Sequence, residues 1–356
     1  MSGDDCVLAI DLGKTWCRAA LLPAERLARP AGLRGAAADP GRRPEAPVPS
    51  ADVVRVPGSI GLAEDGGLPA ALRAVEAALR SLGQRRSSAP GRVVAVGIGA
   101  AGSTAAPHAA RALADRLALR TGAPSAVTSD AVTSHVGALG GSPGVVLAAG
   151  TGAVAVAVSA GGPPADHGRI ELVDGWGQWL GDEGSGAWIG QQGLRAALRA
   201  QDGRGPATTL CDRALEDFGA LDQLPATLVA GGLVRSTAAF APRVLDAARD
   251  GDAVARDVVH AAAARLAETT LAAVRRCRSA GRTPVAVVGG LGQAGPALLD
   301  PWWQAVLSAA PGAQRVTPLG DSLSGAGRLA LRDDLPHESA VVRSDRPDPV
   351  PQLEDL

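Results

Sequence analysis

Hydrophobic residues along the chain fall into short runs typical of strands and longer runs with helical spacing. Apolar residues fill 6–10 and 17–22 on either side of a glycine-containing turn, which predicts two strands joined by that turn. Residues 68–82 carry Leu and Val at helical spacing and end at Gly83, which predicts a helix with a glycine stop. Strands and helices that follow one another in this way indicate an α/β fold.

The same pattern recurs in the second half of the chain. Strands are predicted at 145–149 and 153–158, around a second glycine turn, and a mostly helical stretch follows from 183 to 278. The strand–turn segments at 10–15 and 147–152 are similar to each other. This weak duplication suggests two similar α/β lobes.

Aperiodic segments and the final helix complete the predicted domain organisation. Residues 29–50 are rich in Pro, Ala, Gly and Arg and are predicted to be a mobile surface insertion. We expect an N-terminal lobe over 1–127 and a C-terminal lobe over 128–318. A last helix within 319–332 is expected to pack back on the N-terminal lobe, and the Pro-, Asp- and Arg-rich tail at 333–356 is expected to be disordered.

Composition narrows the function classes. The net charge of -1 over 356 residues gives no reason to expect a nucleic acid or a membrane surface as partner, and no apolar run approaches the roughly 20 residues of a membrane helix. The four cysteines form no CxxC pair, which argues against a zinc or iron–sulfur site within one subunit and against a disulfide framework. Residues 1–5 lack the basic region of a signal peptide, so we expect a cytoplasmic protein with reduced thiols.

Two GxGxxG motifs follow predicted strands, at 97–102 and 290–295. Such a motif can hold a pyrophosphate at a helix N-terminus, but neither is followed about 20 residues later by an acidic residue for the ribose. The chain contains 46 glycines, so plain loops are the preferred interpretation and dinucleotide binding is the alternative. A GxxxxGK[ST] motif is absent, which excludes a P-loop.

The first glycine turn is suited to magnesium and phosphate. Asp11 stands at a strand end, where a carboxylate can hold Mg²⁺ through water. Gly13, Lys14 and Thr15 follow, and the backbone N–H groups of such a turn can approach a phosphate closely. The alternative is a hairpin in which Asp11 only caps the turn.

The second glycine turn and an aspartate between the two turns extend this chemistry. Gly150, Thr151 and Gly152 form a turn like the first, and two such turns could clamp the β- and γ-phosphates of a nucleotide. Asp130 follows a short predicted strand and precedes a predicted helix. It is therefore either a catalytic base or the N-cap of that helix.

The segment at 174–190 reads DGWGQWLGDEGSGAWIG. It resembles the GWGxxxGDEGSGxWIG segment of the N-acetylglucosamine kinase-like ATPases, the BadF/BadG/BcrA/BcrD family, and further family motifs follow in order over 6–330. These motifs are the DxGxT turn at 11–15, the Thr-Ser-Asp at 128–130, the GTG turn at 150–152 and the Gly-Gly turn at 289–290. The resemblance implies a two-lobed actin-like ATPase fold of duplicated ribonuclease H-like domains, with ATP in the interdomain cleft.

The resemblance also implies roles for individual residues. Both glycine turns would hold the phosphates of ATP, with Mg²⁺ at Asp11, and Gly289 and Gly290 would face the adenosine. Asp130 would be the base that takes the proton of the sugar hydroxyl. The residues implied to contact the amino sugar are Gly175, Trp176, Gly177, Asp182 and Ser59. Asp182 is alternatively the cap of a helix that begins at Glu183, and we expect Trp179 and Trp188 in the core.

These roles predict phosphorylation of N-acetylglucosamine to its 6-phosphate. Family sugar kinases often place an Asn of the first lobe on the substrate, but this chain contains no Asn. A kinase of a related sugar, such as glucosamine or a muramic-acid derivative, is therefore an alternative, as are an ATPase that activates an electron-transfer partner and a sugar-sensing regulator. The expected partner is a small-molecule amino sugar, and a homodimer is left open.

Overall fold

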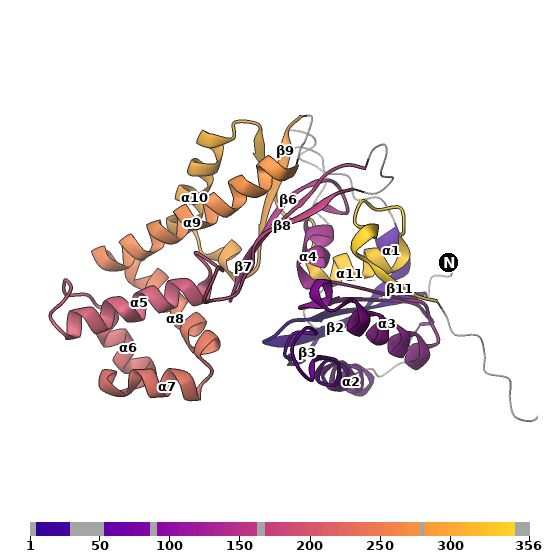
Figure 1. Ribbon diagram of the computed structural model, residues 1–356, viewed down its shortest axis with the longest axis horizontal. Helices are drawn as coiled ribbons and strands as arrows, with labels where there is room; N and C mark the ends of the chain where they lie inside the picture. The colour runs from indigo at the N-terminus through magenta and orange to yellow at the C-terminus, as the bar shows by residue number, and fades with distance from the viewer. Residues whose placement is uncertain (1–4, 29–52, 86–90, 162–167, 278–280, 346–356) are drawn as a thin grey trace, which may run out of the picture. The chain divides into compact units, whose positions relative to one another are not determined.

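The computed structural model divides into two compact units, each built on one β-sheet (Figure 1). The described residues are 5–28, 53–85, 91–161, 168–277 and 281–345. Unit 1 comprises 1–143, 158–170 and 317–356, and unit 2 comprises 144–157 and 171–316. The predicted insertion at 29–50 lies outside the described residues.

Unit 1 contains a six-stranded sheet in the order β11-β5-β4-β1-β2-β3. Strand β1 runs antiparallel to β2 and parallel to β4, so a hairpin and a crossover connection meet at the same central strand. The strands are β1 (Cys6–Leu12), β2 (Trp16–Pro23), β3 (Val54–Pro57), β4 (Val93–Ala100), β5 (Ser125–Thr128) and β11 (Val342–Ser344).

Alternate residues of β1 pack on opposite faces of this sheet. Leu8 and Ile10 belong to the core with α2 and α3, whereas Val7 and Ala9 belong to the core with α1 and α11. Because successive side chains of a strand point to opposite faces, the apolar run of β1 contributes to both cores, and the unit has three layers. The helices of unit 1 are α1 (Ala24–Ala28), α2 (Gly67–Arg85), α3 (Pro107–Thr121), α4 (Asp130–Leu139) and α11 (Ser322–Leu331), with short 3-10 helices at Ser103–Ala105 and Glu338–Ala340.

Unit 2 repeats the same strand order around its own sheet. The order β10-β9-β6-β7-β8 matches β5-β4-β1-β2-β3 when strands are compared by their place in the chain. The duplicated α/β architecture predicted from the two strand–turn segments is thereby confirmed. The strands are β6 (Gly144–Ala149), β7 (Ala153–Val158), β8 (Ile170–Asp174), β9 (Thr283–Val288) and β10 (Ala313–Arg315).

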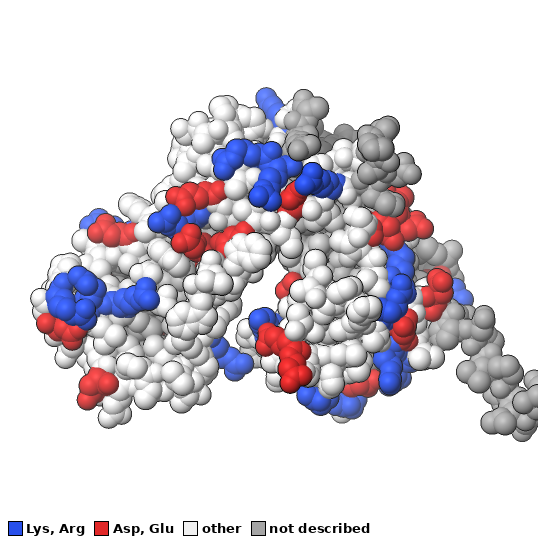
Figure 2. Space-filling view, in the orientation of Figure 1, with Lys and Arg blue, Asp and Glu red and all other residues white. Residues whose placement is uncertain are grey.

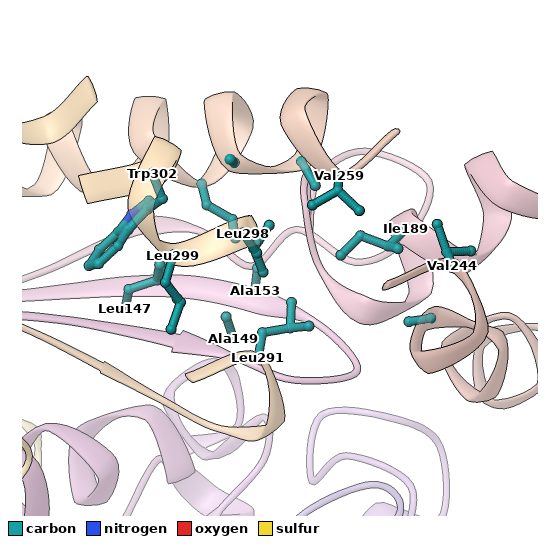
Figure 3. Packing of buried hydrophobic residues seen from close by; sticks show 14 of the residues in the cluster. Leu147, Ala149, Ala153, Ile189, Val244, Val259, Leu291, Leu298, Leu299 and Trp302 are labelled. Carbon is teal, nitrogen blue, oxygen red and sulfur yellow. The ribbon is translucent and has the colours of Figure 1, made fainter. Parts of the chain in front are cut away.

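The core of unit 2 forms where its helices pack on β6 and β7. Figure 3 shows Leu147 of β6 packed near Leu299 and Trp302 of α10, all of them buried. The indole N–H of Trp302 donates to Thr270 Oγ1 at 3.0 Å, so the polar atom of this buried ring is satisfied. The helices are α5 (Gly186–Gln201), α6 (Leu210–Phe218), α7 (Leu224–Ala230), α8 (Leu233–Arg249), α9 (Ala253–Cys277) and α10 (Pro296–Ala309), with 3-10 helices at Leu221–Gln223 and Gly290–Gln293.

The structure corrects two predicted boundaries. Helix α4 belongs to unit 1 rather than to a C-terminal lobe that begins at 128. The tail expected to be disordered from 333 is ordered in its first part, because β11 pairs antiparallel with β5 and His337 is buried. The rest of that tail, 346–356, lies outside the described residues. No helix in the described ranges is long and apolar enough to cross a membrane.

Glycines allow backbone-to-backbone packing between β4, α4 and α11. A Cβ atom at Gly97 of β4 would overlap the Ala326 carbonyl of α11. A Cβ atom at Gly137 of α4 would overlap the Asp321 carbonyl, and one at Gly325 of α11 would overlap the Thr133 carbonyl. Gly97 therefore serves helix packing within a strand, and the first GxGxxG motif opens no dinucleotide-binding helix.

We expect Gly325→Ala to lower the free energy of unfolding by about 1–3 kcal/mol, because the added methyl must push α11 away from the backbone of α4. The matched control is Gly83→Ala in α2, where an added Cβ meets nothing within 4 Å. That change should leave stability unchanged or raise it by about 0.5–1 kcal/mol. Urea unfolding measures both variants, and equal effects would contradict the packing role of Gly325.

A buried histidine pair joins α4 to the ordered part of the tail. His135 and His337 are fully buried, and His337 Nε2 lies 2.9 Å from His135 Nδ1. Burial, and then the charge of His135, lower the pKa of His337 well below its usual 6.5. His337 Nδ1 has no hydrogen-bond partner among the described residues, so a proton on that atom would be unsatisfied.

This pair predicts a loss of stability in mild acid. Below pH 6.5 the unfolded chain binds a proton at His337 that the folded protein excludes, so stability falls by up to about 1.4 kcal/mol per pH unit. The variant His337→Gln should show a weaker dependence between pH 6.5 and 5 in urea unfolding. An unchanged slope in that variant would show that other groups are responsible.

Candidate functional site

The first glycine turn is braced by the segment that follows β3. Gly13 N–H donates to the Trp16 carbonyl at 3.0 Å and closes the hairpin. Gly58 N–H donates to the Thr15 carbonyl at 3.0 Å, and Ser59 N–H donates to the Gly13 carbonyl at 3.2 Å. A side chain at Gly58 would overlap this backbone, so only glycine allows the brace. The predicted substrate residue Ser59 thus lies directly against the predicted phosphate turn.

Asp11 is paired with an arginine across the hairpin. Asp11 and Arg18 are opposite each other in the β1–β2 register, and Arg18 donates to Asp11 Oδ2 from Nη2 at 2.6 Å and from Nε at 2.9 Å. The guanidinium also donates to Asp321 Oδ2 at 3.2 Å. Asp321 is the N-cap of α11, where its Oδ1 accepts from the Ser324 N–H. Arg18 therefore fixes Asp11 relative to α11.

Asp130 is the first residue of α4. The cap of this helix is Ser129, whose hydroxyl accepts from the Val132 N–H at 3.2 Å, so the alternative in which Asp130 is the N-cap is wrong. Burial, and then the negative charge of Asp11, raise the pKa of Asp130 to about 6. The carboxyl group is thus poised to exchange a proton near neutral pH.

The carboxylates of unit 1 fit a magnesium ion in chemical type. No hydrogen bond within the described residues reaches Asp11 Oδ1, which leaves one oxygen of that carboxylate for a cation or its water. The repulsion between Asp11 and Asp130 that raises the pKa of Asp130 is one that a divalent cation would relieve. Lys14 pairs with Glu64 at 2.9 Å, and both side chains are largely exposed. Lys14 is therefore held by a weak surface ion pair, and its contact with a phosphate stays a prediction.

In unit 2 the second glycine turn is anchored to the start of α5. Gly186 N–H donates to the Gly150 carbonyl at 2.8 Å, and Ala187 N–H donates to the Thr151 carbonyl at 3.0 Å. Gly150 N–H also donates to the Gly152 carbonyl at 2.8 Å. Two otherwise unpaired amides of the helix N-terminus thus set the shape of the turn.

The Gly-Gly turn after β9 lies beside this second phosphate turn. Gly289 adopts φ +88°, and a Cβ there would overlap the Ala149 carbonyl at the end of β6. Figure 3 shows Leu291 near Ala149, and the leucine is buried in the core of unit 2. The structure therefore brings Gly289 and Gly290 next to Gly150.

Asp182 lies against the second phosphate turn instead of capping a helix. The cap of α5 is Ser185, which accepts from the Trp188 N–H at 3.2 Å, so the alternative of a helix capped by Asp182 is wrong. Asp182 Oδ1 accepts from the Ala153 N–H at 3.3 Å, and a Cβ at Gly152 would lie 2.9 Å from Asp182 Oδ2. A sugar contact at Asp182 would therefore adjoin the phosphate turn.

The segment between Asp174 and Asp182 presents aromatic rings to solvent. Trp176 and Trp179 are 75% and 76% exposed. The prediction that Trp179 lies in the core is therefore wrong. Trp188 is partly buried and packs against the core of unit 2. An exposed tryptophan next to flexible glycines can stack on a sugar face.

Sequence reasoning missed three residues of these sites: Arg18, Asp174 and Asp321. Once Leu12 is paired with Cys17 in the first hairpin, Asp11 faces Arg18, so the hairpin register could have identified that arginine. Asp174 directly precedes the GWG motif. An aspartate before a glycine-rich loop is a common acceptor for the loop's backbone amides, and this signal could have identified it. Asp321 lies more than 300 residues from Arg18, and no local pattern connects the two.

Charged side chains of both signs are interspersed on the face shown in Figure 2. Within unit 1 the structure brings together the first phosphate turn, Asp11, Ser59 and Asp130. Within unit 2 it brings together Gly150–Gly152, the 175–182 segment and Gly289–Gly290. The roles of these residues stay predictions, as does the placement of ATP in a cleft between the lobes.

Comparisons with known proteins bear on the family and the fold. A model of the BadF/BadG/BcrA/BcrD ATPase family matches residues 61–307. A solved structure from Chromobacterium violaceum, named as an N-acetylglucosamine kinase, is 27% identical with a TM-score of 0.64, over 91% of this chain and 98% of that chain. A search of curated proteins gave no match.

Two further solved structures share the fold. A protein from Porphyromonas gingivalis, also named as an N-acetylglucosamine kinase, is 17% identical with a TM-score of 0.57, over 94% of this chain and 99% of that chain. A ROK family glucokinase from Streptomyces griseus, solved with glucose and AMPPNP, is 18% identical with a TM-score of 0.53, over 91% of this chain and 98% of that chain. At these identities the similarity shows the fold alone.

The electrostatic coupling between Asp11 and Asp130 can be measured directly. We expect Asp11→Asn to lower the pKa of Asp130, because the repulsion is removed and Arg18 loses one of its two carboxylate partners, while burial still keeps that pKa above 3.8. Carbon-13 NMR titration of the carboxyl group in magnesium-free buffer gives this pKa. The control Asp115→Asn, at an exposed position of α3, should leave it unchanged. An unchanged or raised pKa in Asp11→Asn would contradict the coupling.

Proposed function

The chain belongs to the BadF/BadG/BcrA/BcrD ATPase family, and from this premise we propose that it transfers the γ-phosphoryl group of ATP to a hydroxyl group of an amino sugar. N-acetylglucosamine, phosphorylated at its 6-hydroxyl, is the first candidate. The similarity to the Chromobacterium violaceum protein supports this substrate class, because that match covers nearly the whole of both chains.

The observation that carries the proposal is the place of Asp130 at the start of α4, close to Asp11 of the first glycine turn. A carboxylate with a pKa of about 6 is largely ionised at pH 7 and is still basic enough to take a proton from an alcohol as the oxygen attacks phosphorus. Its position at the start of a capped helix holds it rigidly. Asp130 would therefore act as the general base.

The reaction is a single displacement at phosphorus. The sugar oxygen forms a bond to the γ-phosphorus while the bond from that phosphorus to the β,γ-bridging oxygen breaks, and ADP leaves with the electron pair. The hydroxyl proton passes to Asp130. Enzymes accelerate such transfers mainly by positioning the reactants and neutralising charge, which requires rigid turns rather than covalent chemistry.

The glycine turns would supply the positioning. The turn at Gly13 and Thr15 is braced by the backbone of Gly58 and Ser59, and the turn at Gly150 is held by the N-terminal amides of α5. Both keep small residues where a phosphate must approach. A magnesium ion would offset phosphate charge, and Asp11 would hold it through its free oxygen or a water molecule.

On the sugar side, the proposal uses Trp176 for stacking and Asp182 for hydroxyl binding, with Gly175 and Gly177 allowing close approach. The first lobe offers only Ser59 in place of the asparagine common in related kinases. Ser59 is 8% exposed, and its hydroxyl donates to the Ile60 carbonyl at 2.9 Å, so its donor is already engaged. This supports the second candidate, a kinase that accepts a related sugar such as glucosamine or a muramic-acid derivative.

An ADP-release assay with Mg·ATP and a panel of amino sugars tests the proposal. We expect turnover that depends on one of the sugars, and a decrease of kcat by about 10²–10⁴-fold in Asp130→Asn, because the variant cannot accept the proton. ATP binding should be retained in that variant.

The control variant Asp115→Asn should keep wild-type kcat. Sugar-independent ATP hydrolysis, or sugar-dependent turnover that survives in Asp130→Asn, would contradict the proposed mechanism.

A further inference from the structure

Asp174, the last residue of β8, closes the loop that contains the GWG motif. Its Oδ1 accepts from the Gly175 N–H at 2.8 Å and from the Asp182 N–H at 2.7 Å. Its Oδ2 accepts from the Glu183 N–H at 3.1 Å. One carboxylate therefore binds backbone amides at both ends of the 175–181 loop. It accepts hydrogen bonds that backbone carbonyls would accept in a regular sheet.

The backbone at both ends of the loop is held in an unusual conformation. Asp174 and Asp182 have φ values of +66° and +54°, and they are the only non-glycine residues with positive φ in the described ranges. An L-residue in this region costs free energy that the surrounding contacts must offset. The three amide hydrogen bonds to Asp174 form at and directly beside these two positions.

Close packing inside the loop depends on the same carboxylate. We call the Asp174 carboxylate with its three amide hydrogen bonds the clamp. A Cβ at Gly181 would overlap Asp174 Oδ1 and would lie 2.9 Å from Trp176 Cβ, so the loop backbone packs directly against the clamp. Asp174 therefore holds the backbone next to Trp176, at Gly175, and the backbone of Asp182.

The phosphate turn of unit 2 is held separately. Its carbonyls at Gly150 and Thr151 accept from Gly186 and Ala187 of α5, and Asp174 makes none of these bonds. The loop also contacts the strand that follows the turn, through the 3.3 Å hydrogen bond from Ala153 N–H to Asp182. Loss of the clamp should therefore disturb the 175–181 loop much more than the turn at 150–152.

We propose that Asp174 is the positioning residue for sugar binding, holding the 175–182 segment in the conformation that presents Trp176 and Asp182 to the substrate. This inference rests on the proposed function for the identity of the substrate. The clamp itself does not, because the three hydrogen bonds can be observed without turnover.

Three substitutions separate the clamp from the backbone strain. Asp174→Gly removes the carboxylate but tolerates positive φ, whereas Asp174→Ala removes it and keeps the strain. Asp174→Asn tolerates positive φ and keeps one acceptor oxygen, but it places an NH₂ group against an amide donor. The hydrogen bonds of the clamp should therefore be lost in Asp174→Gly and Asp174→Ala and partly kept in Asp174→Asn.

The experiment combines steady-state kinetics with hydrogen exchange on the full chain. We expect the sugar KM to rise at least about tenfold in Asp174→Gly and less in Asp174→Asn, with the Kd of the ATP analogue AMPPNP within about twofold of wild type. Peptides that contain the amides of Gly175, Asp182 and Glu183 should exchange faster, and peptides of α5 from 190 to 201 should not.

Each outcome decides the inference. A sugar KM within twofold of wild type in Asp174→Gly, or a rise in AMPPNP Kd as large as the rise in sugar KM, would overturn it. Faster exchange that also includes α5 would overturn it too, because it would indicate general unfolding of unit 2. If wild type shows no sugar-dependent turnover, the kinase assignment fails, and with it the role in sugar binding. The exchange data then still show whether Asp174 clamps the loop.

Discussion

The close packing of α4 against α11 and β4 is the constraint on which the site of unit 1 depends. At Gly97, Gly137 and Gly325 the backbones approach so closely that a methyl group would not fit. This packing sets the start of α4, where Asp130 lies, relative to the start of α11, where Asp321 binds Arg18. Arg18 in turn holds Asp11. Burial and the negative charge of Asp11 raise the pKa of Asp130, and this helix packing holds both carboxylates in place.

In unit 2 the glycine turn is also held in place, but by other residues than in unit 1. The glycine turn at 150–152 is fixed by the first amides of α5, and the loop at 175–181 is fixed by the carboxylate of Asp174. Asp182 connects the two through the Ala153 amide. The two units thus share a strand order and a glycine turn, but they support that turn with different residues.

The sequence predicted the repeated strand–turn units with their two glycine turns, because these depend on local patterns of glycine and apolar residues. It could not separate a capping aspartate from a functional one. Ser129 and Ser185 turned out to be the caps, which freed Asp130 and Asp182 for other contacts. It also misplaced Trp179, since an apolar neighbourhood in the chain does not reveal that a loop faces solvent. The pairing of Arg18 with Asp321 depends on tertiary structure, which local patterns do not contain.

The central claim is that a sugar hydroxyl, rather than water, accepts the phosphoryl group. Phosphorus-31 NMR of a reaction with Mg·ATP and N-acetylglucosamine, and then with the other amino sugars of the panel, tests this most directly. The account predicts one new phosphomonoester signal that grows in equal amount with ADP. A signal of inorganic phosphate that grows with ADP for every sugar would contradict it, and would show an ATPase that does not use the sugar as acceptor.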